Sequence, residues 1–180
     1  IKGFGGVSSG PGPLTEMHDS IRSLLDKLDG EFITSVAITD LFNFIGKCVV
    51  SGNVRRSAEL AIGRVDDEAY VTMKDWRKFP DELTDRRWAS NNSVFVDQYT
   101  DFSKLTENIL LNGEPGLIFL DNARHYGRTK DGYIADDDRR YDHVAGFNPC
   151  AEQQLESYEL CCLVETFPSN HVDVEDFLRT

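Results

Sequence analysis

Two stretches near the beginning of the chain carry apolar side chains at every third or fourth position, with polar and charged side chains between them. They cover residues 13–28 and 32–52 and are separated by Asp29 and Gly30. This spacing predicts two amphipathic helices, and Gly52 is typical of a residue that ends the second one. The apolar positions are Leu14, Met17, Ile21, Leu24, Leu25 and Leu28 in the first stretch, and Ile33, Val36, Ala37, Leu41, Phe44, Ile45, Cys48 and Val49 in the second.

Further along the chain the pattern changes to short apolar runs. Residues 57–63, 92–96 and 116–121 are predicted to be strands, and residues 102–111 are predicted to be a helix that ends at the turn NGEPG. A polar, irregular stretch then leads to residues 158–167, a largely apolar run that we predict to be a further strand. Strands that alternate with helices predict an α/β fold, and runs such as LIFL suit strands covered on both faces.

Composition narrows the class of protein. The chain has 180 residues, 40% of them hydrophobic, which is enough for the core of one domain or of part of one. The net charge is −12 and the acidic residues are spread along the chain, which disfavours direct binding of nucleic acid or of a membrane surface. The apolar runs are also far shorter than the roughly 20 residues that a membrane span needs.

The four cysteines do not form the framework of a disulfide-rich protein, and neither C-x-x-C nor H-x-x-x-H spacing is present for zinc. We therefore expect a reducing cytoplasm and assign no metal ligand. Cys48 falls on the apolar side of a predicted helix and is expected to be a small buried side chain. The other three, Cys150, Cys161 and Cys162, lie close together in the sequence, which favours redox or catalytic chemistry over three core cysteines.

Two segments could bind phosphate groups. The Gly-rich opening, GFGGVSSGPGP, could present backbone N–H groups to an anion, but it matches no nucleotide-binding motif, which favours a tight loop that leads into the first helix with Pro13 near its N-terminus. The segment SGNVRRSAE places Arg55 and Arg56 on a short loop before a strand. Two guanidinium groups there suit phosphate recognition, although surface ion pairs with carboxylates remain an equal alternative.

The stretch NPCAE sets an amide, a thiol and a carboxylate at alternate positions. If it is extended, Asn148, Cys150 and Glu152 point to one face, with neighbours roughly 6–7 Å apart. The carboxylate could then remove a proton from a substrate hydroxyl that the amide holds. A carboxylate disfavours a nearby thiolate, so the thiol fits better as a neutral donor and acceptor of a hydrogen atom.

A second cysteine can reach the same place. Cys161 follows Cys150 by 11 residues (161 − 150), on a predicted strand that could return beside NPCAE. Cys161 and Cys162 are adjacent, so on a strand only one of them can face that site.

Several blocks together resemble a known family. FNPCAEQQLESYELCCLVETFP, GKCVVSGNVRRSAELAIG, WASNNSVFV and NGEPGLIFLDNAR resemble the catalytic barrel of ribonucleotide reductases, most closely the adenosylcobalamin-dependent (class II) ribonucleoside-triphosphate reductases. The resemblance implies that residues 1–180 are part of the catalytic α/β barrel domain. That domain has ten strands and carries the catalytic cysteine on a central finger loop. It also implies that the N-terminal and C-terminal parts of the parent chain are missing, so we expect the isolated chain to be inactive.

The resemblance also implies roles for individual residues. Cys150 corresponds to the cysteine that becomes a transient thiyl radical and removes the 3′ hydrogen of the ribose. Glu152 corresponds to the carboxylate that takes the 3′-hydroxyl proton, and Asn148 to the amide that hydrogen-bonds the substrate. Cys161 corresponds to one member of the redox-active pair that reduces the 2′ position, whose partner would lie upstream of Ile1.

Further partners follow from the same resemblance. The loop with Asn53, Arg55 and Arg56 corresponds to the specificity loop, which senses a deoxynucleotide or ATP effector and adjusts the choice of substrate. The implied cofactor is adenosylcobalamin, the implied reductant is thioredoxin or a similar dithiol, and the products are deoxyribonucleotides for DNA synthesis. The alternatives are a class I ribonucleoside-diphosphate reductase large subunit, a nucleotide-binding regulatory module without catalysis, and a zinc-binding module.

Overall fold

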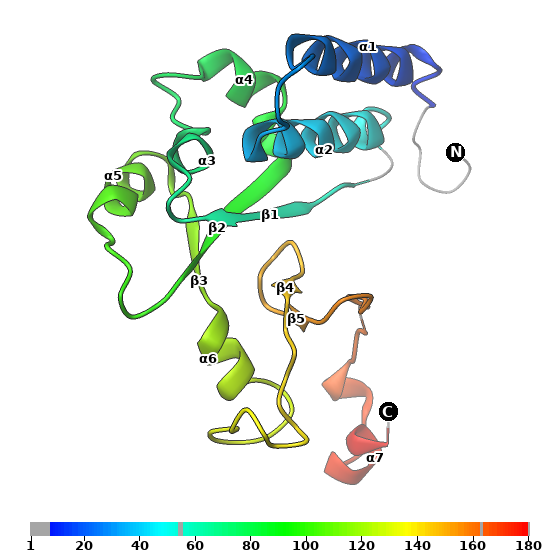
Figure 1. Ribbon diagram of the computed structural model, residues 1–180. Coiled ribbons are helices and arrows are strands. Elements are labelled where there is room, and N and C mark those ends of the chain that lie inside the picture. The colour runs from blue at the N-terminus through cyan, green and yellow to red at the C-terminus, as the bar shows by residue number, and fades with distance from the viewer. Residues whose placement is uncertain (1–7, 54–55, 163, 180) are drawn as a thin grey trace.

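The structure of the chain is a computed structural model that describes residues 8–53, 56–162 and 164–179. Two long helices come first, a parallel sheet with its connecting helices follows, and an irregular part with a small hairpin completes the described chain (Figure 1). The helices are α1 Gly12–Lys27, α2 Ser35–Val50, α3 Glu68–Thr72, α4 Pro80–Asp85, α5 Ser103–Asn112, α6 Leu120–His125 and α7 Val174–Leu178. The strands are β1 Glu59–Arg64, β2 Ser90–Val96, β3 Gly116–Phe119, β4 Gly146–Phe147 and β5 Gln154–Leu155, and short 3-10 turns cover Arg87–Ala89 and Pro168–Asn170.

Helices α1 and α2 confirm the two predicted amphipathic helices. The α1 helix begins with Pro13 in its first turn, and the Thr34 hydroxyl caps α2 by accepting a hydrogen bond from the Ala37 amide at 3.1 Å. The predicted apolar stripe of α2 is only partly correct, because Ala37 and Phe44 are buried while Ile45 and Val49 remain exposed.

Cys48 corrects a second expectation about α2. It is half-buried, not buried, and lines a small cavity between α1 and α2 with Met17 and Phe44. The reason is that α1 covers this side of α2 incompletely, since α1 itself has no fully buried residue.

Strands β1, β2 and β3 form a parallel sheet in that order, so the predicted α/β fold is confirmed as mixed α/β with a three-stranded parallel sheet. Helices α3 and α4, which lie between β1 and β2, are additional to the elements predicted from the sequence. The core is a cluster of Tyr70, Met73, Val94, Val96 and Leu105 between the sheet and its connecting helices.

Tyr70 shows how the sequence allows this packing. Its hydroxyl donates hydrogen bonds to the carbonyls of Ala61, at 2.7 Å, and Ser93, at 3.2 Å. A Cβ atom on Gly63 would overlap the Tyr70 ring, so glycine is what allows the ring to approach β1 this closely. Burial raises the pKa of the Tyr70 hydroxyl, which therefore stays protonated and remains a donor.

The apolar strands are not covered on both faces within the described residues, contrary to the prediction from LIFL. Leu117 and Phe119 of β3 remain 39% and 40% exposed, and only Ile118 of that strand is buried. Ala61 and Val94 pack towards the helices. Because side chains alternate along a strand, Leu60 and Asn91 face the other way, towards the β4–β5 hairpin.

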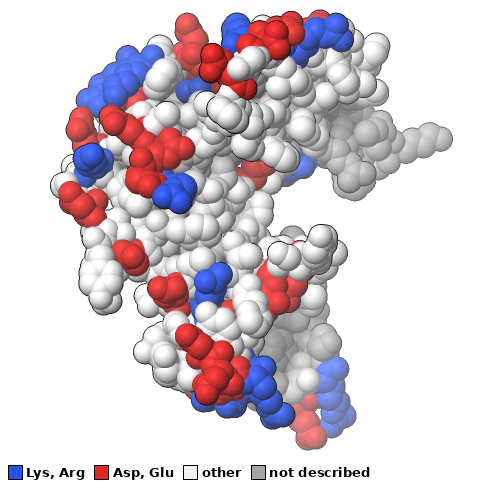
Figure 2. All heavy atoms as spheres, in the orientation of Figure 1, with Lys and Arg blue, Asp and Glu red and all other residues white. Residues whose placement is uncertain are grey.

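The last third of the described chain is largely irregular, as predicted for residues 129–147. An ion pair fixes part of it, since Arg128 Nε lies 3.0 Å from Oδ2 of the fully buried Asp142. Acidic and basic side chains are interspersed over the face shown in Figure 2, in line with their spread along the sequence.

The strand predicted for residues 158–167 is wrong. The described residues of that segment are exposed and include no strand. A strand requires a neighbour whose backbone completes its hydrogen bonds, and the described part of the chain places none beside this segment.

Candidate active site

The NPCAE stretch forms the turn of the β4–β5 hairpin. Gly146 pairs with Leu155 and Phe147 with Gln154 in an antiparallel ladder. The backbone N–H of Asn148 donates to the backbone carbonyl of Gln153 at 3.1 Å. The extended conformation that would align Asn148, Cys150 and Glu152 on one face is therefore wrong. The reason is that the chain reverses direction here to form the hairpin.

The turn nevertheless brings the amide and the carboxylate together. Asn148 is buried, and its Nδ2 lies 2.6 Å from Glu152 Oε1, while its Oδ1 accepts a hydrogen bond from the Gln153 amide at 2.9 Å. Glu152 itself is exposed, so one carboxylate oxygen is held by Asn148 while the group stays accessible from outside.

Cys161 completes this cluster, as the sequence predicted, although it does so from a coil and not from a strand. Its Sγ lies 3.5 Å from Asn148 Nδ2. All four cysteines are free, and Cys150, Cys161 and Cys162 are exposed. Asn148, Glu152 and Cys161 are therefore in contact with one another through the Asn148 side chain. Cys150 lies in the turn midway between Asn148 and Glu152 in the sequence.

Asn91 is a residue of this site that the predictions did not assign. Its Nδ2 donates to the carbonyl of Pro149, the residue before Cys150, at 2.8 Å. The available signal was a run of polar residues, SNNS, at the start of a strand that continues as VFV. Polar side chains in such a place need partners, but the sequence does not name the partner.

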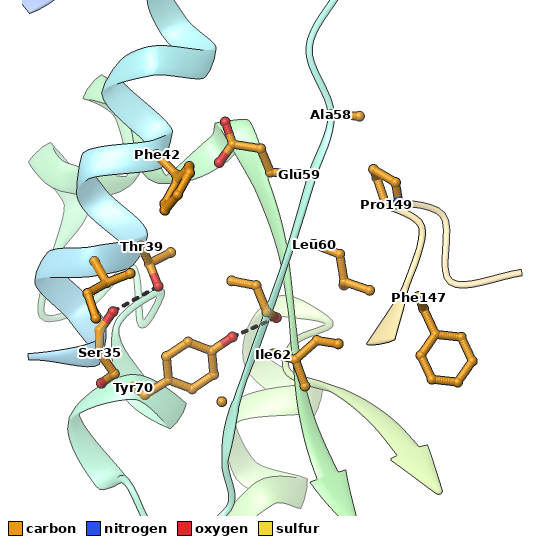
Figure 3. A pocket seen from close by; sticks show the side chains of 13 residues that line it. Ser35, Thr39, Phe42, Ala58, Glu59, Leu60, Ile62, Tyr70, Phe147 and Pro149 are labelled. Carbon is orange, nitrogen blue, oxygen red and sulfur yellow. Dashed lines mark hydrogen bonds between the residues drawn. The ribbon is translucent and has the colours of Figure 1, made fainter. Parts of the chain in front are cut away.

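A groove of about 480 Å³ runs between α2, β1 and the hairpin. Figure 3 shows Phe147 and Pro149 of the hairpin across from Leu60 and Ile62 of β1. Glu59 also lines the groove, and its burial raises the pKa of its carboxyl group. Tyr70 of α3 lines the same groove, so the groove extends along β1 from the helices to the segment that precedes Cys150.

The two segments predicted to bind phosphate, the Gly-rich opening and the loop after α2, contact each other. Asn53 is exposed and adopts a left-handed conformation, with φ of 51°, in the loop after α2, and Arg56 in the same loop is exposed. Arg55 lies outside the described residues, as do residues 1–7 of the Gly-rich opening. Ser9 Oγ lies 3.1 Å from Ser51 Oγ, so the end of that opening contacts the start of the arginine loop.

Among residues 8–53, 56–162 and 164–179, His, Cys, Asp and Glu side chains form no group of three arranged to hold a metal ion. In the same residues, every helix is too short or too polar to cross a membrane.

Ala151 gives the turn a measurable strain. Its φ of 63° is left-handed, which costs a non-glycine residue roughly 1 kcal/mol. We expect Ala151→Gly to stabilise the hairpin and to slow hydrogen exchange of the Asn148 amide by about two- to fivefold, measured by mass spectrometry on the hairpin peptide. Ala145→Gly, at an extended position whose amide bonds Leu155, is the matched control and should speed exchange instead. Equal effects of the two substitutions would contradict the role of the left-handed turn.

Comparisons with known proteins identify the relatives of this chain. No family model matches it, and no solved structure matches it. The chain is 53% identical over all 180 residues to a probable adenosylcobalamin-dependent ribonucleoside-triphosphate reductase of Dictyostelium discoideum. It is 47% identical over 180 residues to the adenosylcobalamin-dependent ribonucleoside-triphosphate reductase of Euglena gracilis. It is 49% identical over 170 residues, 94% of the chain, to the protein of that name from Levilactobacillus brevis.

These relatives are much longer than the chain, which spans 23%, 24% and 22% of their respective lengths. The resemblance expected from the sequence blocks is thereby confirmed. Over its whole length, the chain is homologous to a segment of the adenosylcobalamin-dependent ribonucleoside-triphosphate reductases.

Proposed function

We propose that the full-length protein is an adenosylcobalamin-dependent ribonucleotide reductase that converts ribonucleoside triphosphates to 2′-deoxyribonucleotides for DNA synthesis. The observation that carries the proposal is the cluster of Asn148, Glu152 and Cys161 around the turn that holds Cys150, in a chain 53% identical to a protein with that name. An amide, a carboxylate and two free thiols in one place suit the removal of a ribose hydroxyl.

Residues 1–180 are, in this proposal, part of one catalytic α/β barrel domain with ten strands, and the β4–β5 hairpin is its central finger loop. The hairpin lies on the side of the sheet away from its connecting helices, as a loop inside a barrel would (Figure 1). Ile38 and Phe42, which border the groove beside β1, are 43% and 58% exposed. Further strands of the parent protein would cover these apolar side chains.

The chemistry begins at Cys150, whose thiol is free and exposed and so is accessible to a large radical-generating cofactor. When bound, adenosylcobalamin supplies a carbon-centred radical by homolysis of its cobalt–carbon bond. Cys150 gives up its thiol hydrogen atom, and the resulting thiyl radical removes the 3′ hydrogen atom of the ribose. The same hydrogen atom returns to the 3′ carbon at the end, which leaves Cys150 as the thiyl radical again, ready to take back the hydrogen atom that it gave up at the start.

Glu152 and Asn148 act on the substrate hydroxyl groups. Glu152 accepts the 3′-hydroxyl proton, and Asn148 holds the carboxylate in place through the 2.6 Å hydrogen bond while it hydrogen-bonds the substrate. The 2′-hydroxyl leaves as water with one hydrogen of the redox-active thiol pair to which Cys161 belongs. The other hydrogen of the pair forms the new bond to the 2′ carbon, and the proton held by Glu152 returns to the 3′ oxygen. The pair supplies the two electrons of the reduction, becomes a disulfide and is reopened by thioredoxin or a similar dithiol. The second cysteine of the pair is expected upstream of Ile1.

The loop after α2 selects the substrate. Asn53, Arg55 and Arg56 would sense a deoxynucleotide or ATP effector and pass the choice of base to the substrate site. Two observations support this role: the left-handed turn at Asn53 and the contact between Ser9 and Ser51 that joins this loop to the Gly-rich segment. Because its thiols must be reduced, the protein is expected to work in the cytoplasm. The class I diphosphate reductase is disfavoured by the names of the relatives.

The test measures deoxynucleotide formation by the full-length protein with a dithiol reductant, with and without adenosylcobalamin. We expect product from ribonucleoside triphosphates only when the cofactor is present, and less product from diphosphates. Activity that does not depend on the cofactor would place the protein in another reductase class. Nucleotide binding without turnover under any condition would favour a regulatory module instead.

A further inference from the structure

We propose that Asn91 is a positioning residue for Cys150, and that the partly buried ion pair between Lys74 and Glu114 holds Asn91 in place for this purpose. The inference rests on the proposed function in so far as Cys150 is the reacting thiol. The contact between the sheet and the hairpin can also be tested without that assumption.

Asn91 connects the sheet to the turn that carries Cys150. Its Nδ2 donates to Pro149 O at 2.8 Å. Among the described residues, this is the only hydrogen bond that any strand of the parallel sheet makes to residues 148–152. The other hydrogen bonds of the turn come from within the hairpin or from Cys161.

The accepting carbonyl is the one that fixes the next residue. Pro149 has its φ angle locked by the ring, so rotation about ψ is the main freedom left in that residue. This rotation swings the Pro149 carbonyl and the Cys150 amide together, because both belong to one planar peptide group. A hydrogen bond to the carbonyl therefore fixes the direction in which the chain enters Cys150.

The ion pair in turn fixes Asn91 from both sides. Lys74 Nζ lies 2.7 Å from Glu114 Oε2 and also donates to the carbonyl of Ser90. Glu114 Oε1 accepts a hydrogen bond from the Asn92 amide at 3.3 Å. These are the two peptide groups that flank Asn91, so the pair holds the backbone at Asn91 together with the β1–β2 ladder, in which Asn91 lies opposite Leu60. Lys74 is only 8% exposed and the Glu114 side chain is 24% exposed, so the lysine end of the pair is shielded from water while Asn91 itself lies at the surface.

Such precision matters for the proposed reaction, because a hydrogen atom moves between sulfur and carbon only when the two atoms are nearly in contact. A displacement of about 1 Å in a reacting group can lower a rate about 100-fold. The ladder of the β4–β5 hairpin has only two residue pairs, Gly146–Leu155 and Phe147–Gln154. Such a short ladder by itself fixes the turn with Cys150 only loosely. The bond from Asn91 supplies a fixed point next to Cys150.

The experiment replaces Asn91 in the full-length protein. Asn91→Asp keeps the size of the side chain but exchanges the donating NH2 for an oxygen that repels the Pro149 carbonyl. We expect kcat for deoxynucleotide formation to fall about 10- to 100-fold, with KM for the ribonucleotide unchanged within about twofold. Asn91→Gln retains a donor and should recover a large part of kcat. Asn170→Asp makes the same chemical change on an exposed turn and should leave kcat unchanged.

A second measurement does not require activity. Hydrogen exchange of the peptide that covers residues 146–155 should become faster in Asn91→Asp, while exchange in β1 and β2 stays as in the unsubstituted protein. Unchanged kcat and unchanged hairpin exchange would each overturn the proposal. Faster exchange throughout the sheet would also overturn it, because it would show a general structural role. If the unsubstituted protein forms no deoxynucleotide, the proposed function fails, and the exchange measurement still decides whether Asn91 holds the hairpin.

Discussion

Replacing Cys150 by serine is expected to lower deoxynucleotide formation by the full-length protein at least about 1,000-fold. An O–H bond is much stronger than an S–H bond, so a serine hydroxyl cannot give up its hydrogen atom to a carbon-centred radical. Binding of the ribonucleotide should stay within about twofold, since the change alters one atom of an exposed side chain that makes no disulfide. Turnover and equilibrium binding of the substrate, measured on the same preparation, separate the two effects.

Two other cysteines, Cys162 and Cys48, provide the controls for this substitution. Cys162→Ser changes an exposed thiol next to Cys161 and should leave turnover within about threefold, because the proposed chemistry does not use Cys162. Cys48→Ser, between α1 and α2, tests a thiol far from the hairpin in the sequence. If Cys150→Ser retained turnover, or if Cys162→Ser abolished it, the assignment of the radical to Cys150 would be wrong.

Removing the carboxylate of Asp40 is expected to destabilise the helical part of the protein by about 3–5 kcal/mol. Asp40 lies on α2 with only 2% of its surface exposed. Its two oxygens accept hydrogen bonds at 2.9 Å from Arg87 and at 2.8 Å from Arg86. Arg87 is itself buried and also donates to the Met73 carbonyl at 2.6 Å. Asp40→Ala would leave the buried Arg87 charge without its carboxylate partner. The half-buried Arg86, by contrast, would keep Asp85 at 3.4 Å.

Hydrogen exchange of α2 amides in the full-length protein measures this loss. We expect exchange in Asp40→Ala to be at least about 100-fold faster than in the unsubstituted protein. Glu16→Ala removes a carboxylate that pairs with Lys47 of α2 at 2.9 Å but is 62% exposed, so its effect should be within about 1 kcal/mol. Similar effects of the two substitutions would show that burial of the Asp40 network is not what stabilises α2.

The carboxylate of Asp40 should also make the stability of the protein depend on pH. Burial alone would raise the pKa of Asp40, but the hydrogen bonds and charges of Arg87 and Arg86 outweigh burial and lower it below its ordinary value of 3.8. A depressed folded-state pKa adds stability above pH 3.8 that is lost as the pH falls through the folded-state value. In Asp40→Asn, the increase in α2 hydrogen exchange between pH 5 and pH 3, corrected for intrinsic exchange, should be smaller than in the unsubstituted protein.

The sequence by itself determined the local elements of this chain. Apolar spacing of three and four residues predicted α1 and α2, and short apolar runs bounded by turn residues predicted β1, β2 and β3. The blocks around Cys150 also carried the resemblance that the relatives confirm. These features depend on residues close together in the chain, which is why the sequence is sufficient to recognise them.

Only the tertiary structure decided how the site is assembled. NPCAE is a turn and not a strand because β4 and β5 pair with each other, and the described residues of the 158–167 segment lack the neighbour that a strand needs. The contacts of Asn91 with Pro149 and of Asn148 with Cys161 join residues 58 and 13 positions apart. Side-chain partners at such separations are set by the packing of whole elements, so no local pattern in the sequence specifies them.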